Sequence, residues 1–231
     1  MRRSNRSCLT ATLLISFGGG AEVALPAAQP ESLTLAHWNP HFRCFDLTAH
    51  PECSAGANTA LTSLLTTGCT GEEDVACDGD ALDFASLIEF ELSGYAVPPG
   101  WKAIGAGYAS CGRDWATIFY NSERWQPAPA SAEHPVSQLV GCDYDGRSFA
   151  AGSFVRTTDV AVRLSVVSSH YPQTLGNATA YAKTAASIQG VLASMDRTNV
   201  VFMGDTNTEG PEAAAKQVSH HGTNRTNGEL L

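Results

Sequence analysis

The stretch NVVFMGDTNTEG, from Asn199 to Gly210, gives the clearest indication of the fold. Its apolar run, Val200 to Met203, is typical of a buried strand. Gly204 permits a turn at the end of that strand. An acid and an amide, Asp205 and Asn207, follow at once. We therefore expect a core strand that ends by presenting polar side chains to a binding site.

Other predicted strands end in the same way. Asn39 ends the first of them, Glu89 lies near the end of the second, and His170 ends a later one. Singly, each has a plainer interpretation, as a turn residue, an exposed carboxylate or a buried histidine. A helix cap would equally explain the acid and amide of the opening stretch. Because strand ends of one sheet can converge on one crevice, the ordered set favours a shared site.

The remaining periodicity predicts one α/β domain of mixed layers. Strands are expected over residues 32–38, 81–90, 116–120, 148–156, 160–169 and 200–203. Helical spacing of apolar residues predicts helices over 56–67 and 177–194, with a short further helix from Pro211. The Pro-rich segment 126–135 is expected to be a loop. Beyond residue 28, no segment of the sequence is long and apolar enough to span a membrane.

The first 28 residues have the layout of a secretory signal peptide. Three arginines precede a short apolar run from Leu9 to Phe17, and small residues follow up to Ala28. A disordered N-terminal tail is the alternative. Small residues leave three cleavage points open, after Ala21, Ala27 or Ala28. We expect a signal peptide over residues 1–28 and a secreted domain over 29–231.

The cysteines agree with export. Outside the first 28 residues they form an even set, Cys44, Cys53, Cys69, Cys77, Cys111 and Cys142. Disulfides are expected, and proximity in sequence favours three local pairs, although many other pairings are open. A zinc site is the alternative, but the spacings are irregular and no C-x-x-C pair is present. Asn177 and Asn224 begin glycosylation sequons, which matter only in a secreted protein.

The charge limits the ways in which a substrate can be held. The chain carries a net charge of −9, and loss of three arginines and Glu22 with residues 1–28 changes it to −11. Such a surface does not hold nucleic acid or anionic lipid by electrostatics alone. For a phosphate ester, a divalent cation is expected to supply much of the local positive charge.

The ordered motifs resemble a known family. LTLAHWN at 33–39, DFASLIEF at 83–90, GRDWATIFY at 112–120, VVSSHYP at 166–172 and VVFMGDTN at 200–207 are similar to the endonuclease/exonuclease/phosphatase superfamily. The resemblance covers about residues 32–210. It implies a four-layer α/β/β/α sandwich of two packed mixed sheets. It also implies hydrolysis of a phosphoester, nucleic acid included, by in-line attack of water.

The resemblance assigns a role to individual residues. Asn39 and Glu89 would hold a divalent metal, Mg²⁺ or else Mn²⁺ or Ca²⁺. His170 would contact the scissile phosphate, and Asp205 and Asn207 would orient the attacking water and the phosphate. Arg113 is a further candidate for contact with substrate.

Two departures from the family pattern stand out. Ile88 occupies the place where the family usually has glutamine before the metal-binding glutamate. The family also ends with a Ser-Asp-His element on a final strand, and the chain ends at Leu231 without it. We therefore expect a C-terminally incomplete sandwich that lacks its last strands. A secreted binding module on the same scaffold, without turnover, is the alternative function.

Overall fold

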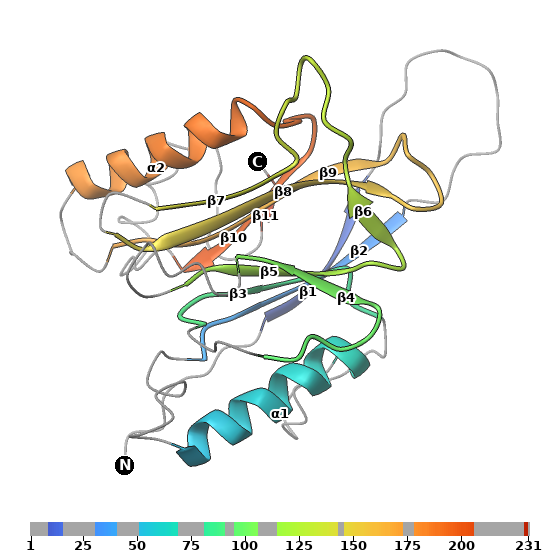
Figure 1. The fold of residues 1–231 in the computed structure, drawn as a ribbon, viewed down its shortest axis with the longest axis vertical. Helices are drawn as coiled ribbons and strands as arrows, with labels where there is room; N and C mark the ends of the chain where they lie inside the picture. Colours follow the sequence, from blue (N-terminus) through green and yellow to red (C-terminus); the bar gives the residue numbers. More distant parts are fainter. Residues whose placement is uncertain are drawn as a thin grey trace.

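Two β-sheets packed face to face form the centre of the fold (Figure 1). The computed structural model describes residues 9–15, 31–40, 51–68, 81–90, 95–105, 115–142, 146–172, 178–205 and 229–230. Each sheet mixes parallel and antiparallel pairs. The predicted sandwich of two mixed sheets is confirmed.

The first sheet has the strand order β1-β2-β3-β5-β4. β2 and β3 are parallel, and the other neighbouring strands are antiparallel. The strands are β1 (Leu9–Ile15), β2 (Glu31–Trp38), β3 (Phe84–Leu87), β4 (Trp101–Ile104) and β5 (Thr117–Asn121). The parallel pair β2 and β3 places the residues that follow both strands at one edge of the sheet.

The second sheet has the order β11-β10-β9-β8-β6, and β7 also pairs with β8. Here β9 and β10 are the parallel pair, with Asp205 opposite His170 in the register. The strands are β6 (Trp125–Pro127), β7 (Gln138–Cys142), β8 (Ser148–Arg156), β9 (Arg163–His170), β10 (Val200–Asp205) and β11 (Glu229–Leu230). Each sheet therefore contributes one parallel pair.

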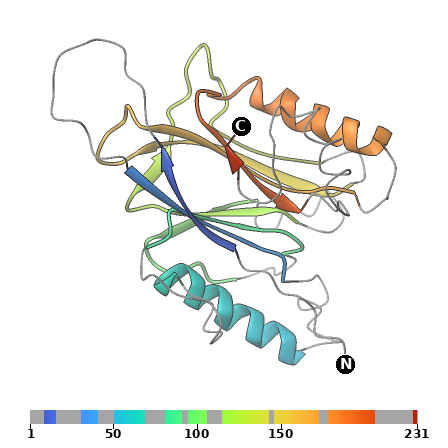
Figure 2. The same cartoon turned by 180° about the vertical axis from the view of Figure 1, so that it is seen from behind.

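A helix covers the outer face of each sheet, which makes four layers (Figures 1 and 2). α1 (Pro51–Thr67) lies on the first sheet and α2 (Ala178–Leu192) on the second. Both predicted helices are confirmed, although α1 begins five residues earlier than the apolar spacing indicated. Among the described residues, no helix has the length and apolar character needed to cross a membrane.

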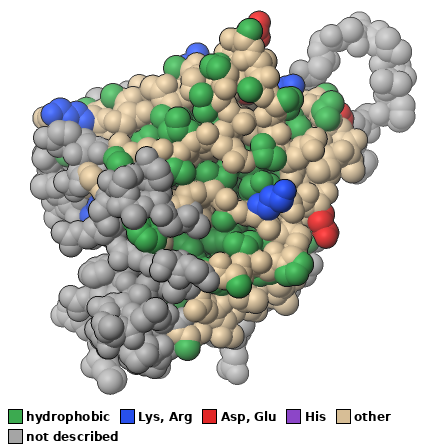
Figure 3. Space-filling view, viewed as in Figure 1, with side chains coloured by type: hydrophobic (Ala, Val, Ile, Leu, Met, Phe, Trp, Pro, Cys, Tyr) green, Lys and Arg blue, Asp and Glu red, His purple; other side chains and the backbone are tan. Residues whose placement is uncertain are grey.

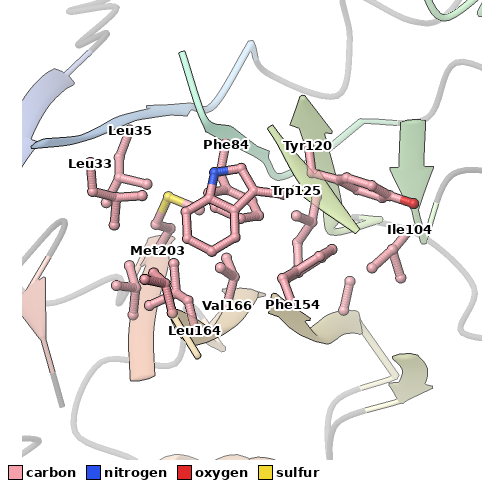
Figure 4. Close-up of a cluster of buried hydrophobic side chains, with 14 residues drawn as sticks. Leu33, Leu35, Phe84, Ile104, Tyr120, Trp125, Phe154, Leu164, Val166 and Met203 are labelled. Carbon is pink, nitrogen blue, oxygen red and sulfur yellow. The ribbon is translucent and has the colours of Figure 1, made fainter. Parts of the chain in front are cut away.

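Successive side chains of a strand point to opposite faces of its sheet, and those on the inner faces form the central core. Side chains of both sheets meet between them, and Phe84 packs against Trp125 and Phe154 with ring centroids 5.1 and 5.0 Å apart (Figure 4). The same layer contains Leu33 and Leu35 of the first sheet, and Leu164, Val166, Val201 and Met203 of the second. Burial of these apolar side chains is the main stabilising contribution to the sandwich.

Asp83, just before β3, is a buried acid at one end of this layer. Its carboxylate accepts hydrogen bonds from Thr34 N at 2.8 Å and Trp125 Nε1 at 2.6 Å. Arg124 Nη1 and Arg156 Nη2 lie 3.2 and 3.8 Å from Oδ1. Burial raises the pKa of Asp83, while these four partners act in the opposite direction. The carboxylate joins strands of both sheets.

The boundaries differ from expectation in several places. The strand predicted over 81–90 is confined to β3, because the chain bends at residues 88 and 89. The strands β4, β6 and β7 were not predicted, and β6 overlaps the start of the expected loop. All three are short and carry partly exposed side chains, so their own pattern is weak and pairing with a neighbour defines them.

The N-terminal segment has a second structural possibility. Residues 9–15, the expected apolar centre of a signal peptide, form β1 and pair antiparallel with β2 over seven positions (Figure 2). An apolar run of this length suits either an edge strand or a signal. The short helix expected from Pro211 lies outside the described residues.

Candidate active site

The layer between the sheets changes from apolar to polar at the carboxyl ends of the parallel strands. Alternate residues of each strand face this layer. On each of these strands, the last apolar side chain of the layer is followed two residues later by a polar one on the same face. In the first sheet, His37 and Asn39 follow Leu35, and Ser86 follows Phe84. In the second sheet, Ser168 and His170 follow Val166, and Asp205 follows Met203. Crevices at the carboxyl ends of strands are the usual place for ligands in α/β sheets.

Four of the residues predicted from the sequence meet at this polar end. Asn39 Nδ2 donates a hydrogen bond to Glu89 Oε1 at 3.2 Å. The same Glu89 oxygen lies 3.7 Å from His170 Nδ1, and His170 Nε2 lies 3.9 Å from Asp205 Oδ2. The first two residues belong to one sheet and the last two to the other. The structure thus brings Asn39, Glu89, His170 and Asp205 into one line across the sandwich.

Exposure differs along this line. His170 is fully buried and Glu89 is only 4% exposed, whereas the side chain of Asp205 is 37% exposed. Solvent therefore reaches the line from the Asp205 end. A buried carboxylate and a buried imidazole therefore lie next to an accessible acid.

The backbone at Glu89 is strained. Its φ is +54°, in the left-handed region that residues other than glycine enter at a cost of about 1–2 kcal/mol. Neighbouring hydrogen bonds hold this bend, from Ile88 N to Trp38 O at 3.2 Å and from Phe90 N to Trp115 O at 3.0 Å. The bend ends β3 early and places the Glu89 carboxylate beside Asn39.

His37 is a site neighbour that the sequence interpretation missed. Its Nδ1 lies 3.2 Å from Ser86 Oγ. Burial lowers the pKa of His37 to about 4; the Asp205 charge and a Ser86 hydrogen bond raise it, and His170 lowers it. These influences place the ring within electrostatic reach of the second sheet's site residues. The available signal was its position two residues before Asn39, on the same strand face.

Arg147 and Tyr181 lie beside the Asp205 end and were also missed. Arg147 is buried and its Nη1 donates to the Tyr171 carbonyl. The Tyr171 ring stacks on Tyr181 at 6.0 Å between centroids. Burial raises the pKa of Tyr181; Asp205 raises it further and Arg147 lowers it. The Arg147 guanidinium and the Tyr181 phenol therefore lie near the exposed acid, Asp205. Neither residue belongs to a motif that the sequence analysis used.

Other predicted residues lie outside the described part of the chain. These are Asn207, Arg113, the sequon residues Asn177 and Asn224, and the cysteines Cys44, Cys69, Cys77 and Cys111. Cys53 lies in α1, in a turn whose side chains are not described. Cys142 is disulfide-bonded. The individual pairings stay predictions.

The donor set suits a hard cation. Asn39 and Glu89 provide amide and carboxylate oxygens, which Mg²⁺ and Ca²⁺ prefer. Within the described ranges, no group of three or more His, Cys, Asp or Glu side chains forms a metal site. Mg²⁺ fits this arrangement, because it commonly takes one or two protein ligands and completes its shell with water and phosphate oxygens.

Gly204 gives β10 its close approach to β9 beside the site. A Cβ at this position would lie 2.3 Å from Ser169 O and 2.9 Å from two atoms of the Phe202 ring. We expect Gly204→Ala to lower the free energy of unfolding by about 1–3 kcal/mol, because overpacking must separate the strands. Equilibrium unfolding in urea measures this change in the free energy of unfolding.

Gly190 of α2 supplies the matched control. A Cβ there meets nothing within 4 Å, so Gly190→Ala is expected to raise stability by up to about 1 kcal/mol through helix propensity. Equal effects of the two substitutions would show that Gly204 is not required for close packing.

Two solved structures resemble this chain in overall fold. D. rerio TDP2 complexed with a single-strand DNA product matches with a TM-score of 0.51 and 13% identity, over 84% of this chain and 66% of that one. An endonuclease/exonuclease/phosphatase family protein from Bacteroides thetaiotaomicron matches with a TM-score of 0.51 and 14% identity, over 77% of this chain and 63% of that one. This chain therefore spans at most about two thirds of the length of either structure.

In sequence, the chain matches no protein-family model and no curated protein. The identities to the solved structures are low, so the likeness concerns the fold alone. The layers, the two mixed sheets and the ordered motifs at the strand ends agree in one conclusion: the chain has the fold of the endonuclease/exonuclease/phosphatase superfamily.

Proposed function

We propose that this protein is a phosphoester hydrolase of the nuclease or phosphodiesterase type that requires a divalent cation. The observation that supports it is the line of Asn39, Glu89, His170 and Asp205 across the carboxyl ends of two parallel strand pairs. Both structural matches agree with this reaction class: one is complexed with a single-strand DNA product, and the other is an endonuclease/exonuclease/phosphatase family protein.

Each residue has a chemical task in the proposed reaction. Glu89 and Asn39 would hold the cation, which neutralises charge on the phosphoryl oxygens when bound. His170 would donate a ring N–H to a phosphoryl oxygen. Asp205, the accessible acid, would accept a hydrogen bond from the attacking water and so orient it in line with the leaving group.

Arg147 would add positive charge at the same end. Its guanidinium is held by the Tyr171 carbonyl, and Tyr171 N in turn donates to Asp205 O at 2.8 Å. The guanidinium is thus tied through Tyr171 to the backbone of Asp205. On the face drawn in Figure 3, the described Lys and Arg side chains lie apart from one another. Because the chain has a net charge of −9, substrate binding would depend on the cation and a few fixed groups.

Secretion belongs to the same proposal. Removal of residues 1–28 would take away β1 and leave β2 as an edge strand. The Cys142 disulfide suits an oxidising compartment, where Asn177 and Asn224 are candidates for glycosylation. N-terminal sequencing of the protein exported from an expressing cell tests the cleavage; an intact Met1 would contradict it.

A hydrolysis assay tests the reaction. The chain is incubated with Mg²⁺, Mn²⁺ or Ca²⁺ and with DNA, RNA or a small aryl phosphodiester. We expect turnover with at least one cation, its loss in EDTA and its return on adding excess cation, because the cation supplies several kcal/mol of transition-state stabilisation. Turnover that persists in EDTA would contradict the cation requirement. Cation binding without turnover on any substrate would favour the binding module.

A further inference from the structure

A hydrogen-bonded group of polar side chains lies directly beneath the candidate site. Ser86 Oγ is 3.2 Å from His37 Nδ1, 2.7 Å from Ser168 Oγ and 3.2 Å from the Met203 carbonyl oxygen. Ser86 and Ser168 are fully buried. His37 and Ser86 belong to the first sheet, whereas Ser168 and Met203 belong to the second. Ser86 thus joins the two sheets at the point where the central layer becomes polar.

Only one arrangement of protons makes all three contacts hydrogen bonds. A serine hydroxyl donates once and accepts twice, and a carbonyl oxygen only accepts. Ser86 must therefore donate to the Met203 carbonyl and accept from Ser168 Oγ and from His37 Nδ1. The His37 ring then carries its proton on Nδ1, and Nε2 has the lone pair in the neutral ring. The geometry fixes the tautomer.

The hydrogen bonds that Ser86 makes with His37, Ser168 and the Met203 carbonyl, here called the bridge, lie one step along the strands from the site. His37, Ser168 and Met203 each lie two residues before a site residue, namely Asn39, His170 and Asp205, on the same strand faces. The site itself is divided between the sheets, so its geometry depends on how the sheet ends are held together. A bonded bridge one step below can set that separation to within the tolerance that catalysis demands.

We propose that His37 is a positioning residue of this site: its ring donates Nδ1–H to Ser86, and the bridge from Ser86 to Ser168 and the Met203 carbonyl holds His170 and Asp205 opposite Asn39 and Glu89. The inference rests on the proposed function for its effect on turnover. The tautomer and the bridge are properties of the folded chain and are tested without turnover.

The first test uses NMR of ¹⁵N-histidine-labelled chain at neutral pH, with His37→Asn to assign the His37 signals. We expect His37 as the neutral Nδ1–H tautomer, and Ser86→Ala to shift the ring toward Nε2–H because the acceptor is lost. We also expect His37→Leu to move the His170 ring signals, and His37→Asn to leave them near their wild-type positions, because an asparagine amide can replace the Nδ1–H donor. An Nε2–H tautomer at His37 overturns the proposal, and so do unmoved His170 signals in His37→Leu.

The second test is kinetic. We expect His37→Leu to lower kcat by about 10-fold or more with little change in KM, which is the range for groups that orient directly acting residues. His37→Asn recovers most of the loss. If His37→Leu fails to fold, Ser86→Ala replaces it, with the same expected fall in kcat. An unchanged kcat in a folded His37→Leu, with Glu89→Gln inactive, overturns the positioning role alone. Absence of wild-type turnover overturns the proposed function, and the NMR result then decides the inference.

Discussion

Glu89→Gln is expected to lower kcat/KM for phosphodiester hydrolysis by about 10³-fold. Glutamine keeps the size of the side chain and an oxygen for the Asn39 amide, which now lies 3.2 Å from Glu89 Oε1. It removes the negative charge that would hold the cation. Loss of several kcal/mol of transition-state stabilisation by the cation corresponds to this factor.

Glu133→Gln is the matched control, because Glu133 is exposed and lies in the loop before β7. Its kcat/KM should equal that of the wild type. Both variants are compared over a range of Mg²⁺ and Mn²⁺ concentrations, so that weakened cation affinity is separated from a lower maximal rate. A Glu89→Gln variant that keeps wild-type kcat/KM at low cation concentration would refute the assignment of Glu89.

Asp83→Ala is expected to lower the free energy of unfolding by about 3 kcal/mol or more. The substitution leaves Thr34 N and Trp125 Nε1 buried without their acceptor, and an unsatisfied buried donor costs about 1–3 kcal/mol. It also removes the partner of Arg156, whose side chain is 12% exposed and whose guanidinium lies over the Trp125 ring. Breaking a buried ion pair on one side is strongly destabilising.

Asp159→Ala is the control for this substitution. Asp159 is exposed, and its described side-chain contact is a hydrogen bond from Ala161 N at 3.0 Å. We expect a loss below about 1 kcal/mol there, as is usual for surface positions. Urea or guanidinium unfolding followed by tryptophan fluorescence measures both variants. Equal small losses would show that the Asp83 cluster does not hold the sheets together.

The two buried acids at the ends of the central layer have different surroundings. Asp83 has two arginines and two N–H donors around it, which is a structural arrangement. Glu89 lies beside an amide and an imidazole, next to an accessible acid. The first arrangement stabilises the fold. The second is the set that we propose to hold a cation.

The strand ends were predictable because strand physics is local. An alternating or continuous apolar run followed by a polar residue marks a strand and its exit. This placed Asn39, His170 and Asp205 at strand ends, although β10 runs on through Gly204, where a turn was expected. Glu89 was predicted at a strand end for a related reason, but the actual strand ends two residues earlier. Its left-handed φ depends on hydrogen bonds to Trp38 and Trp115, which are distant in sequence.

The missed residues depend on tertiary contacts. His37 is a strand residue like its neighbours until Ser86, 49 positions away, comes within reach of its ring. Arg147 lies at the site because it donates to the Tyr171 carbonyl. The Tyr171 ring stacks on Tyr181, whose pKa both Asp205 and Arg147 influence. The short strands β4, β6 and β7 likewise exist through pairing with β5 and β8. No local pattern carries this information.

Anomalous diffraction from crystals grown with Mn²⁺ tests the proposed site most directly. Mn²⁺ can replace Mg²⁺ at oxygen ligands, and its anomalous scattering is strong enough to locate it. The proposed function predicts an anomalous peak in contact with the carboxylate of Glu89 and the side-chain oxygen of Asn39. A chain that hydrolyses phosphodiesters while its only manganese lies away from Glu89 would contradict it.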